Sequence, residues 1–492
     1  MPMVGLSFTA DLLGWFLAFL LPAFVMVGPI RRDRGAARAY LLVVLLHAAA
    51  AAIYVYLPGI LPSRGDTQVF HKYAVLRQST LEGSFSIGSG FFREYLAQVY
   101  SLVGPSFFLG AVLSIWAFAI SVAVLVRLME ILDVRQGKGL VVLLFGALPT
   151  SVLYGTVPMR EPYQVLFFML ACYSMLRFRL TSHPHHLVAA IVFALLMGLL
   201  HKGLIVYAPF LILVMLLVRV DHPRAPSTSR GRMYLHRFAA VALAIGFVMW
   251  MSGAVYKLEG VGGAEVLVTA TTGEGLIEFA TEHRDDEALS KGRTAYGVAL
   301  DTSTPFRFVY SAVMIFFYYM FTPFPWQVRN LMDIYAFGEV ILRIVTLIAI
   351  VRMWRRKGPI DRHMVTLLMI VYLSVAFLWA AGTTNYGTAT RHHMVHQWLL
   401  LLLGVPALLQ SRLGIVRGRL PTGQRITATQ PPTGPATRLS PRMPHLRPLV
   451  DASWPPPRLA VETQGPKGLR SAGVGFRMWS GSPAHRRRLD DR

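Results

Sequence analysis

The sequence predicts an all-α integral membrane protein. Of its 492 residues, 54% are hydrophobic and only 15% are charged, and the mean hydropathy is +0.50. The apolar residues come in blocks that approach the roughly 20 residues an α-helix needs to cross a bilayer. This pattern excludes a soluble globular domain.

Twelve apolar runs are candidate membrane segments. In chain order they cover residues 12–30, 39–60, 105–126, 139–157, 163–178, 187–200, 203–219, 238–256, 306–322, 337–351, 364–382 and 397–411. The first run has no basic stretch before it and no small-residue cleavage site after it, so we expect a retained span rather than a signal peptide. We predict about eleven crossings plus one segment that is re-entrant or interfacial.

Basic loops indicate how these segments are oriented. The clearest are 31–38, 127–139, 177–179, 219–237 and 352–363, and the positive-inside rule places them in the cytoplasm. If 306–322 crossed fully, the strongest basic loop would lie outside. The run is also rich in aromatic residues, which favour the headgroup level. We therefore expect 306–322 to be re-entrant or interfacial, with the amino terminus outside and the carboxyl terminus in the cytoplasm; an ordinary twelfth span is the alternative.

Composition divides the chain in two. We expect a transmembrane domain at 1–411, with long external loops at 61–104 and 257–305. Residues 412–492 hold 15 lysines and arginines against four acids, and 12 of the 30 prolines. Such a segment predicts a disordered, basic cytoplasmic tail. A basic tail beside a membrane is more typical of contact with anionic lipid headgroups than with nucleic acid, so nucleic acid is not an expected partner.

This threading places several ionisable residues at the outer ends of apolar segments. They are Asp66, Arg160, Glu161, His201, Lys202 and Arg391, with Asn385 and His392 beside Arg391 in "NYGTATRHH". An ionisable group near the hydrocarbon costs about 2 to 3 kcal/mol and usually serves a site or a pathway. We expect these residues to share one external pocket.

Simpler structural roles compete at each position. The side chain of Lys202 would extend to the lipid headgroups, and Arg160 would pair with Glu161. Asp66 would cap a helix that begins at Thr67. We also expect an ion pair between Glu339 and Arg343, which are four residues apart. A helix with one apolar face could lie on the membrane surface, and that face contains Phe91, Phe92, Tyr95, Leu96 and Val99. His392 and His396 have the spacing of metal ligands on one helical face. No acidic or cysteine ligand lies near these histidines. Neither a metal nor a cofactor is expected.

Arginine, lysine and the backbone amides of a glycine turn are what a phosphate group needs. At a membrane pocket this predicts a lipid phosphate, bound by Arg160, His201, Lys202, Asn385, Arg391 and His392. The hydrocarbon chain would lie along an apolar outer groove against 306–322. If the lipid carries a sugar, a carboxylate takes the proton of the acceptor hydroxyl while cations stabilise the departing phosphate. Asp66 is the first candidate for this base and Glu161 the second.

Four stretches carry a resemblance to a known class. "GDTQVFHKYA", "PMREPY", "FTPFPWQVRN" followed by Glu339, and "NYGTATRHH" before the last apolar run resemble bacterial polytopic proteins of envelope polysaccharide assembly, namely GT-C glycosyltransferases and O-antigen polymerase-like proteins. The resemblance covers residues 39–411. It implies a GT-C-like fold in the bacterial inner membrane, an essential aspartate at Asp66 and a phosphate-binding cation at Arg391. Many GT-C enzymes have paired acids in this loop, whereas Thr67 follows Asp66 here.

The function expected first is transfer of a sugar from a polyprenyl-phosphate-linked donor to an envelope glycan or lipid acceptor at the extracytoplasmic face. A polymerase or ligase that uses polyprenyl-diphosphate glycans is a close variant. A transporter or lipid flippase is the alternative from a different class, and a structural subunit of an assembly complex is a third. Transporters usually contain a repeated half, and the sequence shows no internal repeat.

Overall fold

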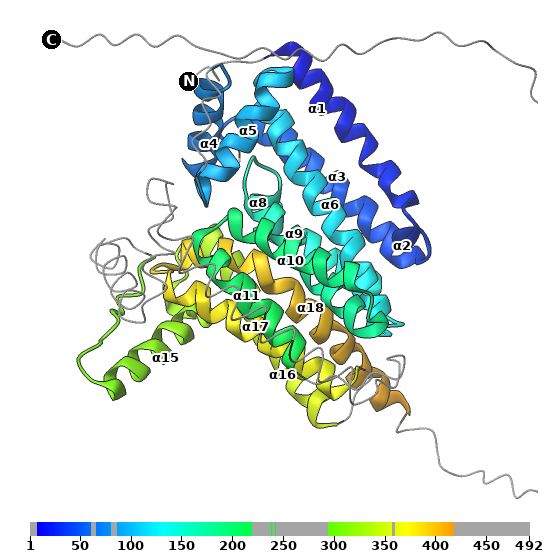
Figure 1. The fold of residues 1–492 in the computed structure, drawn as a ribbon, viewed down its shortest axis with the longest axis vertical. Helices are drawn as coiled ribbons and strands as arrows, with labels where there is room; N and C mark the ends of the chain where they lie inside the picture. Colours follow the sequence, from blue (N-terminus) through cyan, green and yellow to red (C-terminus); the bar gives the residue numbers. More distant parts are fainter. Residues whose placement is uncertain are drawn as a thin grey trace, which may run out of the picture. The chain divides into compact units, whose positions relative to one another are not determined.

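The computed structural model of the protein is built from α-helices (Figure 1). It describes residues 7–60, 65–79, 86–218, 238, 242, 294–356 and 360–417. Within these ranges there is no β-strand, and the extended backbone forms only an isolated bridge between Ala295 and Asn385. The predicted all-α class is confirmed for this part of the chain. The contacts divide the chain into Met1–Thr422 and Gly423–Arg492, and the second unit lies outside the described residues.

Six helical segments in the described ranges are long and apolar enough to cross a membrane. They are α1 (Phe8–Leu20) continued by the 3-10 helix η1 (Pro22–Met26), α3 (Arg34–Tyr56), α6 (Phe107–Ile131), α16 (Leu331–Arg355), α17 (Arg362–Ala381) and α18 (Tyr386–Arg417) up to Gln410. A seventh is the bent pair α7 (Lys138–Ala147) and α8 (Pro149–Gly155). The short helix α2 (Gly28–Arg31) joins η1 to α3. The chain is therefore a membrane protein with several candidate spans, and a total of about eleven crossings stays a prediction.

Three consecutive helices after α8 pack side by side (Figure 1). They are α9 (Glu161–Thr181), α10 (Pro184–Leu199) and α11 (Lys202–Leu217). The last two have 16 residues each, which corresponds to about 24 Å of helix against a hydrocarbon thickness of ~30 Å. Helices of this length are shorter than the hydrocarbon layer is thick. The predicted run 238–256 lies almost entirely outside the described residues.

Helix α6 forms the centre of the packed core. Its sequence is apolar on every face, and such a helix is stable only when it is surrounded by protein or lipid. It packs against α1, α3 and α9. The ring of Phe118 stacks on Phe145 of α7 at 4.7 Å and on His47 of α3 at 4.6 Å. This core positions the helices that carry the charged residues.

The bend of 59° between α7 and α8 is held by a carboxylate from another helix. Oε1 of Glu339 accepts a hydrogen bond from the backbone N–H of Thr150 at 2.9 Å, and Oε2 accepts from its hydroxyl at 2.5 Å. The start of α8 has unpaired N–H groups and a positive dipole end, both of which a carboxylate satisfies. The expected ion pair between Glu339 and Arg343 is therefore wrong. Arg343 instead donates to the carbonyl of Met320.

The predicted first external loop contains two helices, α4 (Gly65–Arg77) and α5 (Ser89–Val103). The apolar face of α5 does not lie on the membrane surface, and that expectation is wrong. Phe92 is 1% exposed, with its ring 5.5 Å from Phe70 of α4 and 5.7 Å from Tyr163 of α9. An apolar helical face indicates burial, but the sequence does not tell whether protein or lipid covers it.

The aromatic run 306–322 forms one continuous helix, α15 (Pro305–Phe321), followed by the 3-10 helix η2 (Pro325–Gln327). Its carboxyl-terminal half packs into the protein, because Ile315, Tyr319 and Met320 are buried. Its first turns expose Phe306 and Tyr310. Whether α15 crosses the membrane or lies within one leaflet stays a prediction. Residues 257–293 of the second external loop, and residues 418–492 of the tail, lie outside the described residues.

Candidate functional site

The helix that carries Arg391 begins before Gly387, although the glycine turn was expected to precede that helix. Helix α18 starts at Tyr386, so Gly387 lies in its first turn instead of preceding it. The side-chain oxygen of Asn385 accepts a hydrogen bond from the N–H of Thr388 at 2.8 Å. This is the contact of a helix cap. Asn385, expected to bind phosphate, thus uses its side-chain oxygen to begin α18.

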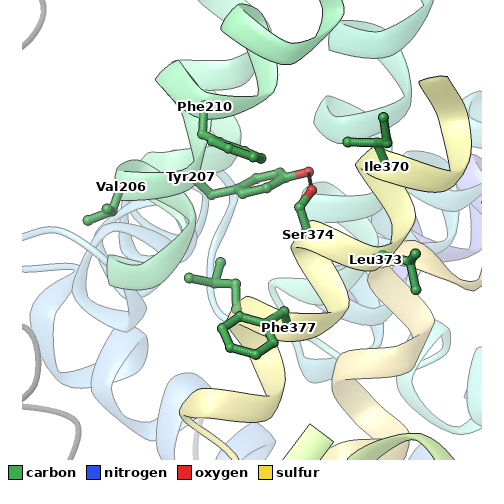
Figure 2. Close-up of a pocket in the computed structure, with 8 residues that line it drawn as sticks. Val206, Tyr207, Phe210, Ile370, Leu373, Ser374 and Phe377 are labelled. Carbon is green, nitrogen blue, oxygen red and sulfur yellow. Dashed lines mark hydrogen bonds between the residues drawn. The ribbon is translucent and has the colours of Figure 1, made fainter. Parts of the chain in front are cut away.

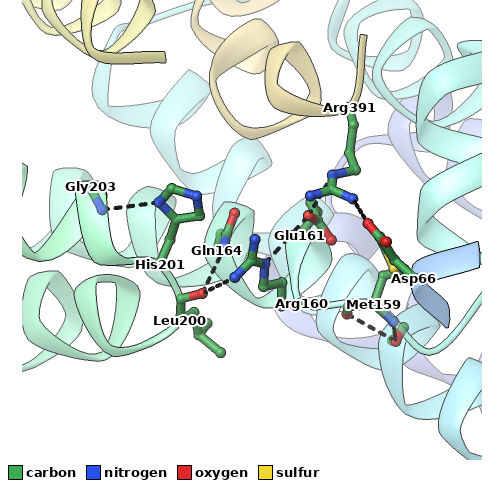
Figure 3. A network of polar contacts seen from close by, with 10 residues as sticks. Asp66, Met159, Arg160, Glu161, Gln164, Leu200, His201, Gly203 and Arg391 are labelled. Carbon is green, nitrogen blue, oxygen red and sulfur yellow. Dashed lines mark hydrogen bonds and ion pairs between the residues drawn. The ribbon is translucent and has the colours of Figure 1, made fainter. Parts of the chain in front are cut away.

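Arg391 lies between two carboxylates (Figure 3). Its Nη1 donates a hydrogen bond to Oδ2 of Asp66, and its Nε lies 3.0 Å from Oε1 of Glu161. The Glu161 side chain is 1% exposed and the Asp66 side chain 58% exposed. Asp66 belongs to the first turn of α4 instead of capping it, which corrects the expected start of that helix. The structure thus brings the ends of α4, α9 and α18 together.

Arg160 extends this network from the residue before α9. Its Nε lies 3.7 Å from Oε1 of Glu161, so the expected pairing of these neighbours is confirmed. Its Nη1 donates to the carbonyl oxygen of Leu200 at 3.2 Å, and Nε2 of Gln164 donates to the same oxygen at 3.3 Å. Carbonyls at a helix end lack partners within their own helix. Arg160 and Gln164 therefore fasten the α10–α11 turn to α9.

The rings of His201, His392 and Trp379 pack together beside the α10–α11 turn. Nδ1 of His201 accepts a hydrogen bond from the N–H of Gly203 at 3.1 Å, which leaves Nε2 to carry the ring proton. Its ring centroid is 4.4 Å from that of Trp379. The ring of His392 stacks on Trp379 with its centroid 3.9 Å away, and it lies 6.1 Å from the ring of His201. Nε2–H of His201 is therefore a hydrogen-bond donor, as phosphate binding requires.

His392 is held by a second hydrogen bond at the end of α17. The Thr383 hydroxyl donates to the carbonyl of Trp379 at 2.6 Å and lies 2.9 Å from Nδ1 of His392. Because the hydroxyl proton is already used, Nδ1–H of His392 is the donor in the second contact. His396, at metal-ligand spacing, instead lies 2.9 Å from the hydroxyl of Tyr319. The described residues contain no group of three His, Cys, Asp or Glu side chains that could hold a metal ion.

Lys202 is the first residue of α11 and lies next to Gly88, which belongs to the segment that precedes α5. Gly88 has a φ of 90°, a conformation that favours glycine, and its N–H donates to the carbonyl of Leu199 at 2.8 Å. A Cβ atom at position 88 would lie 3.4 Å from Cγ of Lys202 and 4.0 Å from Nη1 of Arg160. The chain therefore approaches both cations closely here. Lys202 has no ion-pair partner among the described residues.

Charge and unused hydrogen-bonding atoms show what this cluster can bind. Arg160, Lys202 and Arg391 supply three positive charges, and Asp66 and Glu161 supply two negative ones. Oε2 of Glu161 and Oε1 of Gln164 are buried acceptors without a hydrogen-bond partner in the described part of the chain. Buried polar atoms are normally paired. The cluster thus offers one surplus positive charge and two acceptors for donors such as hydroxyl groups.

Sequence reasoning missed four residues of this site: Gly88, Gln164, Trp379 and Thr383. Gln164 is three positions after Glu161 on the same helix, a spacing that places both on one face, so this residue was detectable. Trp379 lies within an apolar run, where its sequence context is that of a core or lipid-facing residue. Nothing in the sequence around Trp379 indicated that it belongs to the site.

A comparison of the chain with protein-family models, curated proteins and solved structures found no match. The class of the protein is therefore defined by its own fold and site. It is a helical membrane protein in which α4 and the ends of α9, α11 and α18 form a partly buried cluster of opposite charges.

Proposed function

We propose that the protein is a membrane glycosyltransferase that moves a sugar from a polyprenyl-phosphate-linked donor to an envelope glycan or lipid acceptor at the extracytoplasmic face. The observation that carries this proposal is the contact of Arg391 with both Asp66 and Glu161. It joins a guanidinium suited to phosphate with an exposed carboxylate suited to removing a proton.

The surplus charge of the cluster favours a particular donor. A sugar linked to a polyprenyl monophosphate is a phosphodiester with one negative charge, which neutralises the single surplus positive charge of Arg160, Lys202 and Arg391 over the two carboxylates. A diphosphate-linked glycan carries at least two negative charges and would leave an excess of negative charge, which is costly near hydrocarbon. A monophosphate donor is therefore preferred to the diphosphate of a polymerase or ligase.

In the proposed reaction the acceptor oxygen forms a bond to the anomeric carbon as the bond from that carbon to the phosphate oxygen breaks. Asp66 takes the acceptor proton, and Arg160, Lys202 and Arg391 stabilise the charge that grows on the leaving phosphate. The geometry is that of an inverting displacement, with the acceptor hydroxyl in place of water. Phosphate competes for Arg391, which frees Asp66 to act as the base.

Glu161 has a different role in this scheme. Its side chain is 1% exposed, and its Oε1 contacts both Arg160 and Arg391. Two guanidinium groups repel each other in a low-dielectric site, and a carboxylate between them offsets that repulsion. Glu161 is therefore a positioning residue, and Asp66 is the better candidate for the base.

The proposal includes the setting predicted from the basic loops. The protein is placed in a bacterial inner membrane, with its amino terminus outside and its carboxyl terminus in the cytoplasm. The basic residues at the far end of α16, Arg352 and Arg355, then face the cytoplasm, as the positive-inside rule requires. Its partners are the donor lipid, the acceptor and the surrounding membrane lipids.

The test is sugar transfer by the purified protein in nanodiscs, using a panel of polyprenyl-monophosphate hexoses and pentoses with envelope extract as the acceptor source. Asp66→Asn and Arg391→Ala should insert normally and lose product by about 100-fold or more. Arg307→Ala is the matched control, because it removes an arginine from an exposed ion pair with Asp301 that shares no residue with the cluster. Product formation unchanged in both site variants would reject the proposal.

A flippase would behave differently in the same preparation. In sealed vesicles it would move the lipid-linked sugar between leaflets without breaking the bond between sugar and phosphate. Movement that is lost in Arg391→Ala, in the absence of any transfer product, would replace the transferase proposal with a transporter.

A further inference from the structure

An apolar groove of about 590 Å³ runs between α11 and α17 (Figure 2). It is lined by Val206, Tyr207 and Phe210 of α11 and by Ile370, Leu373, Ser374, Phe377 and Leu378 of α17. Phe210 is 43% exposed and Phe377 is 52% exposed, so the walls are open to the surroundings instead of closing on each other. Phe316 of α15 borders the groove, with its ring 6.1 Å from that of Phe377.

One end of this groove lies next to the charged cluster. Lys202, Val206 and Phe210 follow each other at intervals of four, which places them on one face of α11. Val206 is therefore about 6 Å along the helix from Lys202. On the opposite wall, Leu378 is followed by Trp379, whose ring contacts His201. The groove thus begins one helical turn from the cations.

The polar atoms of the groove are already used. The hydroxyl of Tyr207 donates to the carbonyl of Val371 at 3.0 Å and lies 3.0 Å from the hydroxyl of Ser374. The Ser374 hydroxyl also donates to that carbonyl. A ligand therefore finds an almost entirely apolar surface here, which fits a hydrocarbon chain and not a sugar.

We propose that this groove holds the isoprenoid chain of the donor lipid, with the phosphate at the Lys202 end. The inference deepens the proposed function and rests on it for the identity of the lipid. The groove ends near Lys202, which has no ion-pair partner among the described residues. This arrangement fits a single chain with a terminal phosphate, because the hydrocarbon stays among Phe210, Leu373 and Phe377 while the anion meets Lys202. The chain then lies between α11 and α17, with α15 at its border.

The test uses photo-crosslinking in nanodiscs. A polyprenyl phosphate with a diazirine on its chain is the probe, and phosphatidylglycerol with a diazirine on an acyl chain is the comparison. The labelled peptides are located by mass spectrometry. The polyprenyl probe should label residues 206–210 and 370–378, and unlabelled polyprenyl phosphate should compete. Val206→Trp and Leu373→Trp fill the groove and should lower this labelling about tenfold. Ile348→Trp, at a 46% exposed position of α16, should leave it unchanged.

Each other outcome has a distinct meaning. Equal labelling of the groove by phosphatidylglycerol, without competition by polyprenyl phosphate, would show ordinary bilayer lipid and overturn the inference. Specific labelling elsewhere, for example confined to α15, would also overturn it. Asp66→Asn separates the two proposals, since it should abolish transfer and leave groove labelling intact. Groove labelling in a protein that transfers no sugar would retain the lipid site and reject the transferase.

Discussion

Nε of Arg391 lies 3.0 Å from Oε1 of Glu161, and the same guanidinium donates to Asp66 from its other side. The two carboxylates differ in access to solvent, since Asp66 is largely exposed and Glu161 is buried. Arg391 thus contacts one carboxylate that the acceptor of the sugar can reach, Asp66, and one that it cannot reach, Glu161. This difference assigns separate roles to two acids that the sequence treats as alternatives.

Chemical rescue should distinguish those roles. Asp66→Ala removes a base from an open position, so added formate is expected to enter and restore about a tenth or more of the lost transfer activity. Glu161→Ala should not respond, because its site is closed and its loss separates Arg160 from Arg391. The measurement is the transfer rate of each variant against formate concentration. Rescue of Glu161→Ala alone would make Glu161 the base.

Acid should weaken the α4–α5 pair. Burial lowers the pKa of His71 from its usual 6.5 to about 4, and its ring lies 2.8 Å from the hydroxyl of Tyr100. Between these values the unfolded chain binds a proton that the folded chain does not, so stability falls as pH drops through that window. The full loss is on the order of 3 kcal/mol. Hydrogen exchange of residues 65–77 between pH 7 and pH 4 measures it.

His71→Phe should remove most of this pH dependence, and the same change at the exposed His185 should not. An exchange profile of residues 65–77 that has the same pH dependence in His71→Phe as in the wild type would show that His71 is not the cause.

The contact that bends α7 into α8 should be sensitive to one hydroxyl group. Thr150→Val leaves the buried carboxylate of Glu339 with one hydrogen bond fewer, which costs about 1 to 3 kcal/mol. Thr150→Ser keeps the hydroxyl and is the matched control. Thermal unfolding in detergent should therefore give Thr150→Val a lower midpoint than Thr150→Ser. Equal midpoints would mean that the hydroxyl contact does not stabilise the bend.

The topology has a separate test at the end of α15. Trp326 is 75% exposed in the 3-10 helix that follows this segment. If 306–322 does not cross the membrane, a reporter fused after Trp326 should be active in the outer compartment. A reporter at the end of the chain should be active in the cytoplasm. A cytoplasmic signal after Trp326 would make α15 a full span and change the orientation of the helices around it.

The sequence was sufficient to predict the charged residues that meet at the site, but not how they are used. Alternating basic loops placed Asp66, Glu161 and Arg391 on one side, and the structure brings these three into direct contact. The partner of Glu339 was not predictable, because the break at Pro149 that exposes the Thr150 N–H appears only when α8 bends. Spacing along one helix favoured Arg343, and a tertiary contact replaced it.

The apolar face of α5 illustrates the same limit. Its spacing predicted a surface that avoids water, and the membrane and the protein interior satisfy that requirement equally well. The positions of Phe70 on α4 and Tyr163 on α9 determine that Phe92 is covered by protein. Local pattern thus predicted the helices, and long-range packing decided what each one contacts.

The most direct test is a structure of the protein in nanodiscs with a polyprenyl-monophosphate sugar bound. The account predicts phosphate density within hydrogen-bonding distance of Arg391 and at least one of Arg160 and Lys202, with the anomeric carbon facing Asp66. Phosphate at the opposite end of the helices, beside Arg352 and Arg355, with the contact between Arg391 and Asp66 unchanged, would contradict it.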